Sequence, residues 1–370
     1  MTDVFVAADN IVSPLGTDTA ENFFCLKSGL SGVQQHERAR MSNGPFYASL
    51  FGPTQFSNSG YTKFEQLLHT SMEDALRISG IRPAGTKTVL IVCSTKGNTH
   101  LLDEDTHIAP EKISLPASAA RLARDFRFDT APIVVSNACI SGLLGMITGM
   151  RLIRAGVFEN AVVTGADVIS RFILSGFGSF QALSPGHCKP FDKDRDGINL
   201  GEGAATIVLS SRPEYKDGLR LRGGSVSNDA NHISGPSRTG RELCQTIERS
   251  LLEAGVDKTE IGFISTHGTA TAYNDEMEAK AITHAGLNKV PANSLKGYYG
   301  HTLGAAGLIE SIVTLQSIRE GVILPSLGFE QNGVSTPLNI ATTLMSTPLT
   351  TCLKTASGFG GCNAAIVLGK

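Results

Sequence analysis

The chain has 370 residues, of which 41% are hydrophobic and 18% charged, so it can bury a large core and is not a disordered protein. The formal net charge of −2 gives no reason to expect a nucleic-acid partner, and the seven scattered cysteines include no Cys-x-x-Cys pair for a metal. The odd cysteine count, together with the lack of a signal peptide or a membrane-length apolar run, leads us to expect a cytoplasmic protein without a membrane span.

Short apolar runs alternate with segments of helical spacing along the whole chain. In the first half we expect strands at residues 4–8, 88–93, 132–135 and 161–164, and helices at 66–78 and 117–126. In the second half we expect strands at 204–209, 219–226, 262–265, around 292 and at 364–368, and helices at 241–254, 275–284 and 305–318. This alternation predicts an α/β protein with a parallel or mixed sheet. Residues 213–218 form the most plausible seam within one compact unit.

Cys139 stands where a predicted strand ends and an apolar helix, expected over about 141–155, begins. The free N–H groups of a helix N-terminus favour a thiolate, which is the form of cysteine that acts as a nucleophile. The alternative is a small buried residue at a tight turn, since free cysteines are usually buried and inert. This segment alone leaves both interpretations open.

Two histidines lie in loops of small residues in the second half. His267 follows a predicted strand within Ser-Thr-His-Gly-Thr-Ala-Thr, and His301 follows a glycine and precedes a helix of small residues. Such loops allow close approach to a substrate, although a lone histidine is more often structural. Lys296 and Glu310 flank His301 and could form either a buried ion pair or a surface pair of little energetic weight. Residues 358–363 form a glycine-rich turn around Phe359 before the final strand.

Taken in order, these segments resemble one family, and segments 12–16 and 189–204 extend the same pattern over nearly the whole chain. The chain resembles the β-ketoacyl synthases of fatty-acid and polyketide biosynthesis, within the thiolase superfamily. The resemblance implies a thiolase-like fold, in which two similar βαβαβαββ halves pack as a layered α-β-α-β-α unit. Residues 1–212 would form the half with the nucleophile and residues 213–370 the half with both histidines.

The resemblance also implies a mechanism and a set of site residues. Cys139 would accept an acyl group from an acyl carrier protein, and decarboxylation of malonyl carrier protein would precede Claisen condensation. His267 and His301 would stabilise the enolate, and the backbone N–H groups of Cys139 and Phe359 would form the oxyanion hole. Lys296, paired with Glu310, would support the histidine loop. Substrate-binding residues and the gate would be Thr269, Thr271, His232, Ser234, Gly358, Gly360 and Phe359.

The same resemblance calls for no cofactor and no metal. It implies acyl-loaded and malonyl-loaded carrier proteins as partners, and a homodimer, with a heterodimer containing a related subunit as the alternative. Three departures from the family pattern bear on the substrate and the partner. Lys96 stands where many relatives have a small or apolar residue, and Cys362 replaces the usual threonine. Gln181 stands where relatives often carry a basic residue that docks the carrier protein. Arg121, Arg124 and Arg127 offer another basic face for the carrier, or a solvated helix surface.

Four rival interpretations remain at this point. A thiolase would carry one histidine and a second cysteine ahead of the C-terminal glycines, whereas Cys362 follows them here. A non-catalytic, chain-length-factor-like partner subunit usually lacks the nucleophile, and a synthase that starts from acyl-CoA would replace one histidine by asparagine. A cysteine hydrolase needs a group that orients its histidine. Fatty-acid elongation and a specialised pathway, such as aryl polyene synthesis, are both compatible with the sequence.

Overall fold

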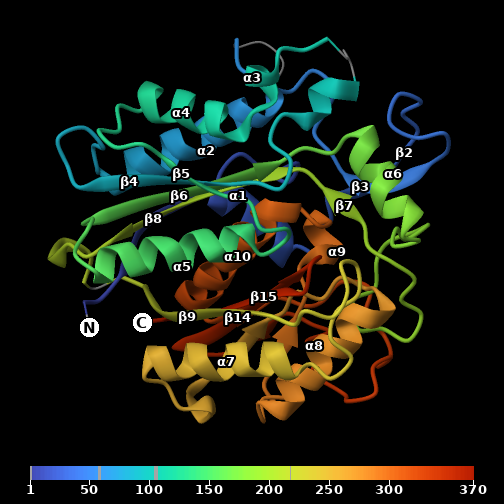
Figure 1. Ribbon diagram of the computed structural model, residues 1–370. Coiled ribbons are helices and arrows are strands. Elements are labelled where there is room, and N and C mark those ends of the chain that lie inside the picture. Colours follow the sequence, from blue (N-terminus) through green and yellow to red (C-terminus); the bar gives the residue numbers. More distant parts are fainter. Residues whose placement is uncertain (1, 57–59, 104–106, 217) are drawn as a thin grey trace.

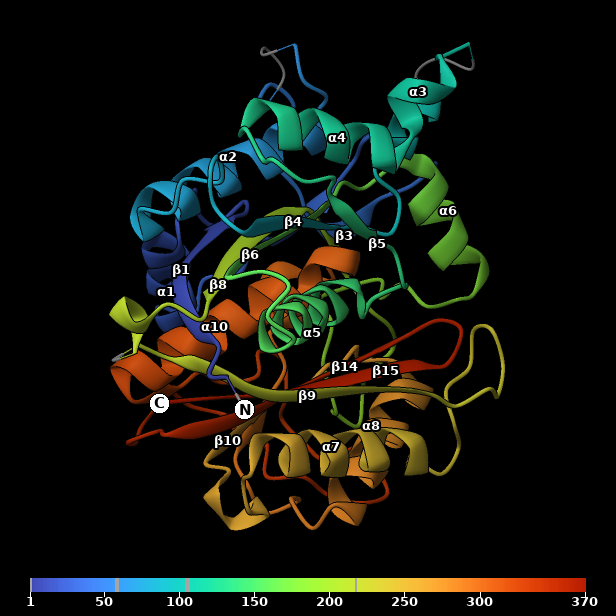
Figure 2. The same cartoon turned by 60° about the vertical axis from the view of Figure 1, so that its left-hand side comes forward.

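The protein is built of five layers, in which three layers of helices alternate with two layers of strands (Figures 1 and 2). The computed structural model describes residues 2–56, 60–103, 107–216 and 218–370. Ten strands follow one another in the order β11-β10-β14-β15-β9-β1-β8-β6-β4-β5. A single residue pair, Phe5 with Arg220, joins β1 to β9, so the order divides there into two sets of five strands.

The first set of strands comes from the first half of the chain. β6 lies antiparallel to β8 and parallel to β4, and β5 is the edge strand beside β4. This first set contains β1 (Phe5–Val12), β4 (Thr88–Cys93), β5 (Ile133–Val135), β6 (Asn160–Asp167) and β8 (Gly203–Ser210). The second set contains β9 (Arg220–Asn228), β10 (Phe263–Ser265), β11 (Ala292–Asn293), β14 (Thr351–Gly358) and β15 (Cys362–Gly369).

Each helical layer covers a separate hydrophobic core. The outer layers contain α2 (Lys63–Ser79) and α4 (Leu115–Asp125) on one side, and α7 (Arg241–Ala254) and α8 (Ala272–His284) on the other (Figure 2). The central layer contains α5 (Ser141–Arg154) and α10 (Ala306–Glu320). Because both faces of this layer meet a sheet, α10 is buried around almost its whole circumference.

Shorter elements complete the fold and surround the central layers. The helices are α1 (Thr19–Lys27), α3 (Pro110–Ile113), α6 (Arg171–Ser179) and α9 (Lys296–Tyr299). The strands are β2 (Val33–His36), β3 (Phe46–Ser49), β7 (Leu200–Gly201), β12 (Val322–Ile323) and β13 (Met345–Ser346). Among the described residues, 3₁₀ segments lie at Thr99–Asp103, Pro213–Tyr215, Lys258–Glu260 and Leu303–Ala305. Within the described ranges, no helix is long and apolar enough to cross a membrane.

The structure confirms the α/β class and the layered α-β-α-β-α arrangement. The expected strands and helices are present, and several extend beyond their predicted ends; β1, for example, continues to Val12 along β8. The sequence patterns did not indicate α6 or β14, and β14 was hidden because Lys354 and two threonines interrupt its apolar residues. The division at 212/213 stays a prediction, and residue 217 of the predicted seam lies outside the described residues.

Candidate active site

Cys139 lies in the turn that joins β5 to α5. Ala138 has a φ of 43°, in the left-handed region that L-residues seldom occupy, so the turn is sharp. The Ser141 hydroxyl fixes it by accepting the Asn137 N–H (2.8 Å) and donating to the Ala138 carbonyl (2.7 Å). A Cβ atom on Gly358, at the end of β14, would lie 2.9 Å from the Cys139 amide nitrogen, so a larger residue would collide there.

The surroundings of Cys139 keep its thiol protonated. The residue is 8% exposed, and burial raises the pKa of the thiol to about 12. Cys362 adds to the rise in pKa, whereas the positive charge of Lys296 opposes it. The N-terminus of α5, which the sequence indicated, acts in the opposite direction to burial, because it favours a thiolate. The reaction of Cys139 at neutral pH therefore requires a neighbouring base.

His267 lies in a loop held by the carboxylate of Glu278 on α8. The two oxygens of Glu278 accept the N–H groups of His267 and Gly268, each at 2.8 Å. The Thr355 hydroxyl also donates to Glu278, at 2.6 Å. Gly268 has a φ of 42°, and a Cβ atom there would lie 2.6 Å from Ser294 Cβ, so this position needs glycine. The clamp from Glu278 fixes the backbone from which the imidazole of His267 projects.

His301 follows α9 and is fixed by its backbone. Its N–H donates to the Asn199 carbonyl at 2.7 Å, and its carbonyl accepts the Gly201 N–H at 3.0 Å. Both ring nitrogens are buried, and neither has a hydrogen-bond partner among the described residues. The ring lies edge-on to that of His267, with the centroids 5.2 Å apart. An unpaired buried imidazole next to a cavity is free to bind a substrate group.

The structure brings together the three residues that the sequence indicated most strongly. The Cys139 sulfur and one ring nitrogen from each of His267 and His301 lie within 4.8 Å of one another. Burial is the first cause that lowers the pKa of both imidazoles well below the usual range, and Lys296 lowers them further. Both histidines are therefore neutral at physiological pH, and each can donate through one ring nitrogen and accept through the other.

One cysteine and two histidines also form a ligand set that suits zinc. The positive charges of Lys296 and Lys354 act on both imidazoles, and such charges oppose a bound cation. The arrangement fits better a nucleophile flanked by two neutral imidazoles than a metal centre.

A buried cluster of charges lies behind the histidines. Lys296 and Glu310 form the ion pair that the sequence allowed, and both side chains are buried, so the alternative of a surface pair is wrong. Sequence reasoning missed a second lysine: Lys354 Nζ lies 2.8 Å from the other carboxylate oxygen of Glu310. A lysine in the middle of a buried strand was the available signal, but the strand itself went unrecognised.

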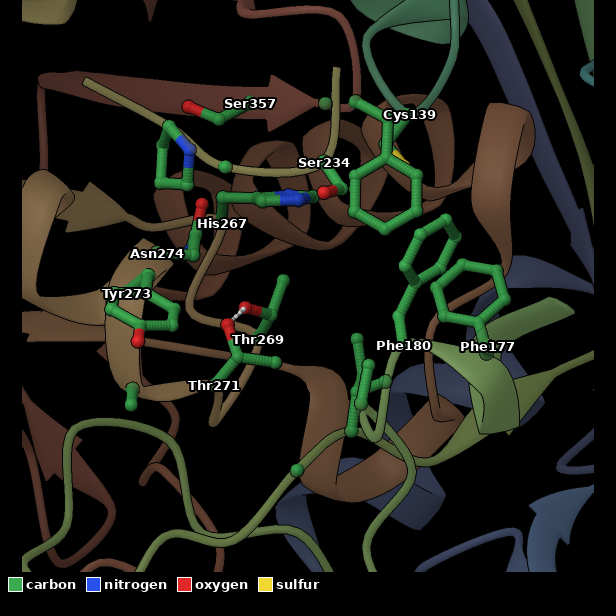
Figure 3. Close-up of a pocket in the computed structure, with 18 of the residues that line it drawn as sticks. Cys139, Phe177, Phe180, Ser234, His267, Thr269, Thr271, Tyr273, Asn274 and Ser357 are labelled. Atoms are coloured by element: carbon green, nitrogen blue, oxygen red, sulfur yellow. Dashed lines mark hydrogen bonds between the residues drawn. The ribbon is translucent and has the colours of Figure 1, made fainter. Parts of the chain in front are cut away.

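A cavity of about 380 Å³ reaches Cys139, His267 and His301. The hydroxyls of Thr269 and Thr271 lie on its wall, joined by a hydrogen bond of 2.9 Å (Figure 3). The other predicted substrate-binding residues on its wall are His232, Ser234, Gly358 and Phe359. Gly360 is not part of the wall; its N–H donates to the Ile233 carbonyl at 2.7 Å.

Three aromatic rings gather on one side of this cavity. Phe359, which is 39% exposed, stacks on Phe177 with 5.6 Å between ring centroids and meets Phe180 edge-on at 5.4 Å. Figure 3 shows Phe177 and Phe180 side by side, across the cavity from Thr269. Sequence reasoning singled out Phe359 but missed the other two, because a phenylalanine in the unpredicted α6, or directly after it, carries no signal of its own.

Two family models match the chain: "Beta-ketoacyl synthase, N-terminal domain" over residues 42–214 and "Beta-ketoacyl synthase, C-terminal domain" over residues 220–330. The chain belongs to the β-ketoacyl synthase family. The chloroplastic 3-oxoacyl-[acyl-carrier-protein] synthase II of Arabidopsis thaliana is 29% identical over 98% of this chain and 75% of its own. The 3-oxoacyl-[acyl-carrier-protein] synthase 2 of Vibrio cholerae is 32% identical over 64% of this chain and 61% of its own.

Solved structures of other β-ketoacyl synthases share the fold over the whole chain. The ishigamide ketosynthase/chain length factor superposes with a TM-score of 0.90 at 26% identity, covering 100% of this chain and 99% of that one. A ketosynthase in complex with its chain length factor from Xenorhabdus doucetiae gives a TM-score of 0.87 at 26% identity, covering 100% and 98%. These similarities confirm the thiolase-like fold.

Proposed function

We propose that this β-ketoacyl synthase joins an acyl group to a malonyl-derived unit on acyl carrier protein, releasing CO₂ and a β-ketoacyl product. The observation that carries the proposal is the Cys139 thiol within 4.8 Å of two neutral imidazoles, at a cavity that can admit a substrate arm. The curated relatives are named as synthases of this reaction class, which supports the assignment.

The first half-reaction transfers the acyl group to Cys139. The thiol passes its proton to a neutral histidine, and the sulfur attacks the thioester carbonyl of the acyl carrier protein. The new C–S bond to Cys139 forms, the bond to the carrier thiol breaks, and the carrier thiolate takes up the proton. The N–H groups of Cys139 and Phe359 would bind the oxyanion at the acyl carbon. This route does not depend on a pre-formed thiolate, in agreement with the raised pKa of Cys139.

The second half-reaction uses both imidazoles as donors. When the malonyl carboxylate leaves as CO₂, the electron pair of the broken C–C bond forms a thioester enolate. N–H groups of His267 and His301 would donate to the enolate oxygen, and a neutral imidazole with one N–H suits this role. The enolate carbon then attacks the Cys139 thioester. The C–C bond of the product forms, and Cys139 leaves as a thiolate that regains a proton.

The remaining residues would bind and align the substrate arm. Thr269 and Thr271 would bind the pantetheine through their hydroxyls, with His232, Ser234 and Gly358 on the same cavity wall. Phe359 would act as a gate, and Lys296 with Glu310 would support the histidine loop. For Gly360 the structure supports only an indirect role, through the turn that carries Phe359.

The partners would be acyl-loaded and malonyl-loaded carrier proteins. A second copy of the chain is the expected subunit partner, and a related subunit is the alternative, as in the Xenorhabdus doucetiae complex of a ketosynthase with its chain length factor. A non-catalytic role for this chain is disfavoured because Cys139, His267 and His301 are all present and meet in one site. The cytoplasmic location expected from the sequence stays a prediction.

Mass spectrometry of the intact protein tests the proposal. Wild-type protein incubated with a panel of acyl carrier proteins should gain the mass of one acyl group, and Cys139→Ala should gain none. Cys244→Ala, which removes a buried cysteine on α7, is the matched control and should be acylated like wild type. The preferred acyl chain would separate fatty-acid elongation from a specialised pathway. A folded wild-type sample that accepts no acyl group from a broad panel would overturn the proposal.

A further inference from the structure

A second buried lysine lies beside the catalytic histidines, in the middle of β14. Lys354 Nζ lies 3.2 Å from the carbonyl oxygen of Ser265, 2.9 Å from that of Thr266 and 2.7 Å from that of Thr355. It also lies 2.8 Å from an oxygen of Glu310. An ammonium group has three N–H donors and a charge that suits a carboxylate, whereas a neutral amine has only two donors. The three carbonyl acceptors match the three donors of an ammonium group, and the nearby carboxylate favours the charged form against burial, which lowers the pKa of Lys354.

Lys296 binds the next carbonyl group along the chain, that of His267. Its Nζ donates to the His267 carbonyl at 3.0 Å and pairs with the other oxygen of Glu310. Two ammonium groups that share one carboxylate therefore hold three consecutive carbonyl groups, those of residues 265–267. β10 ends at Ser265, so these contacts fix the direction in which the chain leaves the strand and reaches the imidazole of His267.

The charges in this cluster balance. Glu278 supplies the second negative charge, and its carboxylate already holds the N–H groups of His267 and Gly268. Lys296 on α9, Lys354 on β14, Glu310 on α10 and Glu278 on α8 thus form a buried set with no net charge. Removal of one member leaves an uncompensated charge in a medium that solvates charge poorly.

We propose that Lys354 is a positioning residue for His267: it orients the strand end that leads to the imidazole and, together with Lys296, balances the buried charges of Glu310 and Glu278. The inference rests on the proposed function, in which His267 donates to the enolate oxygen. Family resemblance pointed to Lys296 and Glu310 alone, whereas Lys354 makes the larger number of contacts to the same strand end.

Lys354 also affects the ionisation of the two histidines. The ionisable side chains that act on His267 are Cys139, His301, Lys296 and Lys354, and Glu278 contacts its backbone. A nearby cation disfavours the imidazolium form, so both lysines lower the pKa of His267 and His301. Loss of the Lys354 charge must therefore raise the pKa of these imidazoles.

The test compares Lys354→Met with Lys27→Met. Lys27 pairs with Glu320 on the same helix as Glu310, but at the surface, so it is a matched control. Histidine labelled with ¹³C at Cε1 allows titration by NMR, with signals assigned from His267→Asn and His301→Asn. We expect Lys354→Met to raise the pKa of at least one of the two imidazoles by about one unit. The acid limb of malonyl-carrier decarboxylation should move to higher pH by a similar amount.

Kinetic constants and a double variant distinguish a positioning role of Lys354 from a general loss of structure. Lys354→Met should lower kcat for decarboxylation about tenfold and leave KM within about twofold, because Lys354 is fully buried and does not line the cavity. Adding Glu310→Gln to Lys354→Met should return the acid limb close to its wild-type position, since the charge balance is restored, while kcat stays low. If Lys354→Met does not fold, Lys354→Gln removes the same charge and should produce the same shift.

A folded Lys354→Met or Lys354→Gln protein with wild-type histidine titrations and a wild-type acid limb would overturn the proposal, as would an equal shift in Lys27→Met. The NMR titration needs no substrate. It therefore still decides the role of Lys354 if the wild-type protein has no decarboxylase activity, a result that would count against the proposed function alone.

Discussion

At the scale of single residues, the most consequential property is the protonation of the Cys139 thiol. Burial raises its pKa to about 12, so at neutral pH only a very small fraction is thiolate. Alkylation by iodoacetamide requires the thiolate. We therefore expect the alkylation rate of Cys139 to increase about tenfold per pH unit from pH 7 to 10, without reaching a plateau. Peptide mass spectrometry after timed quenching measures this rate for Cys139 separately from the other cysteines.

A plateau of the alkylation rate near neutral pH would mean that the N-terminus of α5 outweighs burial. Cys139→Ala identifies the modified peptide, and circular dichroism at each pH confirms that the rise in rate does not come from unfolding.

The site residues differ in how far the sequence could reveal them. Cys139, His267 and His301 stand in loops whose small neighbours mark them locally. Lys354 and Phe177 gain their roles from residues far along the chain, Glu310 and Phe359 respectively. A local pattern carries no information about such partners, so these roles became visible only in the folded chain.

At the scale of elements, the contact between α5 and α10 sets the distance between the nucleophile and the second histidine. Cys139 precedes α5 and His301 precedes α10, and the two helices approach closely at Gly142 and Gly307. A Cβ atom on Gly307 would lie 2.9 Å from the backbone nitrogen of Leu143, which no change of rotamer can relieve. The small residues in these helices therefore serve the geometry of the site as well as packing.

We predict that Gly307→Ala lowers the free energy of unfolding by about 1–3 kcal/mol, because overpacking forces the two helices apart. The control is Gly176→Ala on α6, where an added Cβ atom meets nothing within 4 Å. This control should leave stability unchanged or raise it by about 0.5–1 kcal/mol, since alanine favours a helix. Urea denaturation followed by circular dichroism measures both. Equal stabilities for the two variants would contradict the tight contact.

Prediction of elements from the sequence succeeded where hydrophobic spacing dominates and failed where tertiary contacts override it. β4 and β6 are buried along their whole lengths and read as apolar runs. β14 is buried at all but its last residue, but it contains Lys354, whose charge is neutralised by Glu310 from another element. The family resemblance, and not hydrophobic spacing, indicated how the predicted elements stack into layers.

At the scale of the whole molecule, β5 ends the strand order, so its outer edge pairs with no other strand in the described part of the chain. Ile133 and Val134 are only half-buried there, and an apolar edge of this kind favours pairing with another strand. We predict a dimer of about 78 kDa, twice the 39.0 kDa of one chain, by size-exclusion chromatography with light scattering. A mass of one chain at micromolar concentration would contradict this prediction.

The aromatic cluster around Phe359 has an optical consequence, because the chain contains no tryptophan. Phe180 is 53% exposed and touches the Phe359 ring edge-on, so an indole in its place would be the sole fluorophore of its kind in the protein. Emission from Phe180→Trp would then report the solvent exposure and ring contacts of this one position. The arrival of an acyl chain and the displacement of Phe359 would become visible as changes in wavelength and intensity on the timescale of stopped-flow mixing.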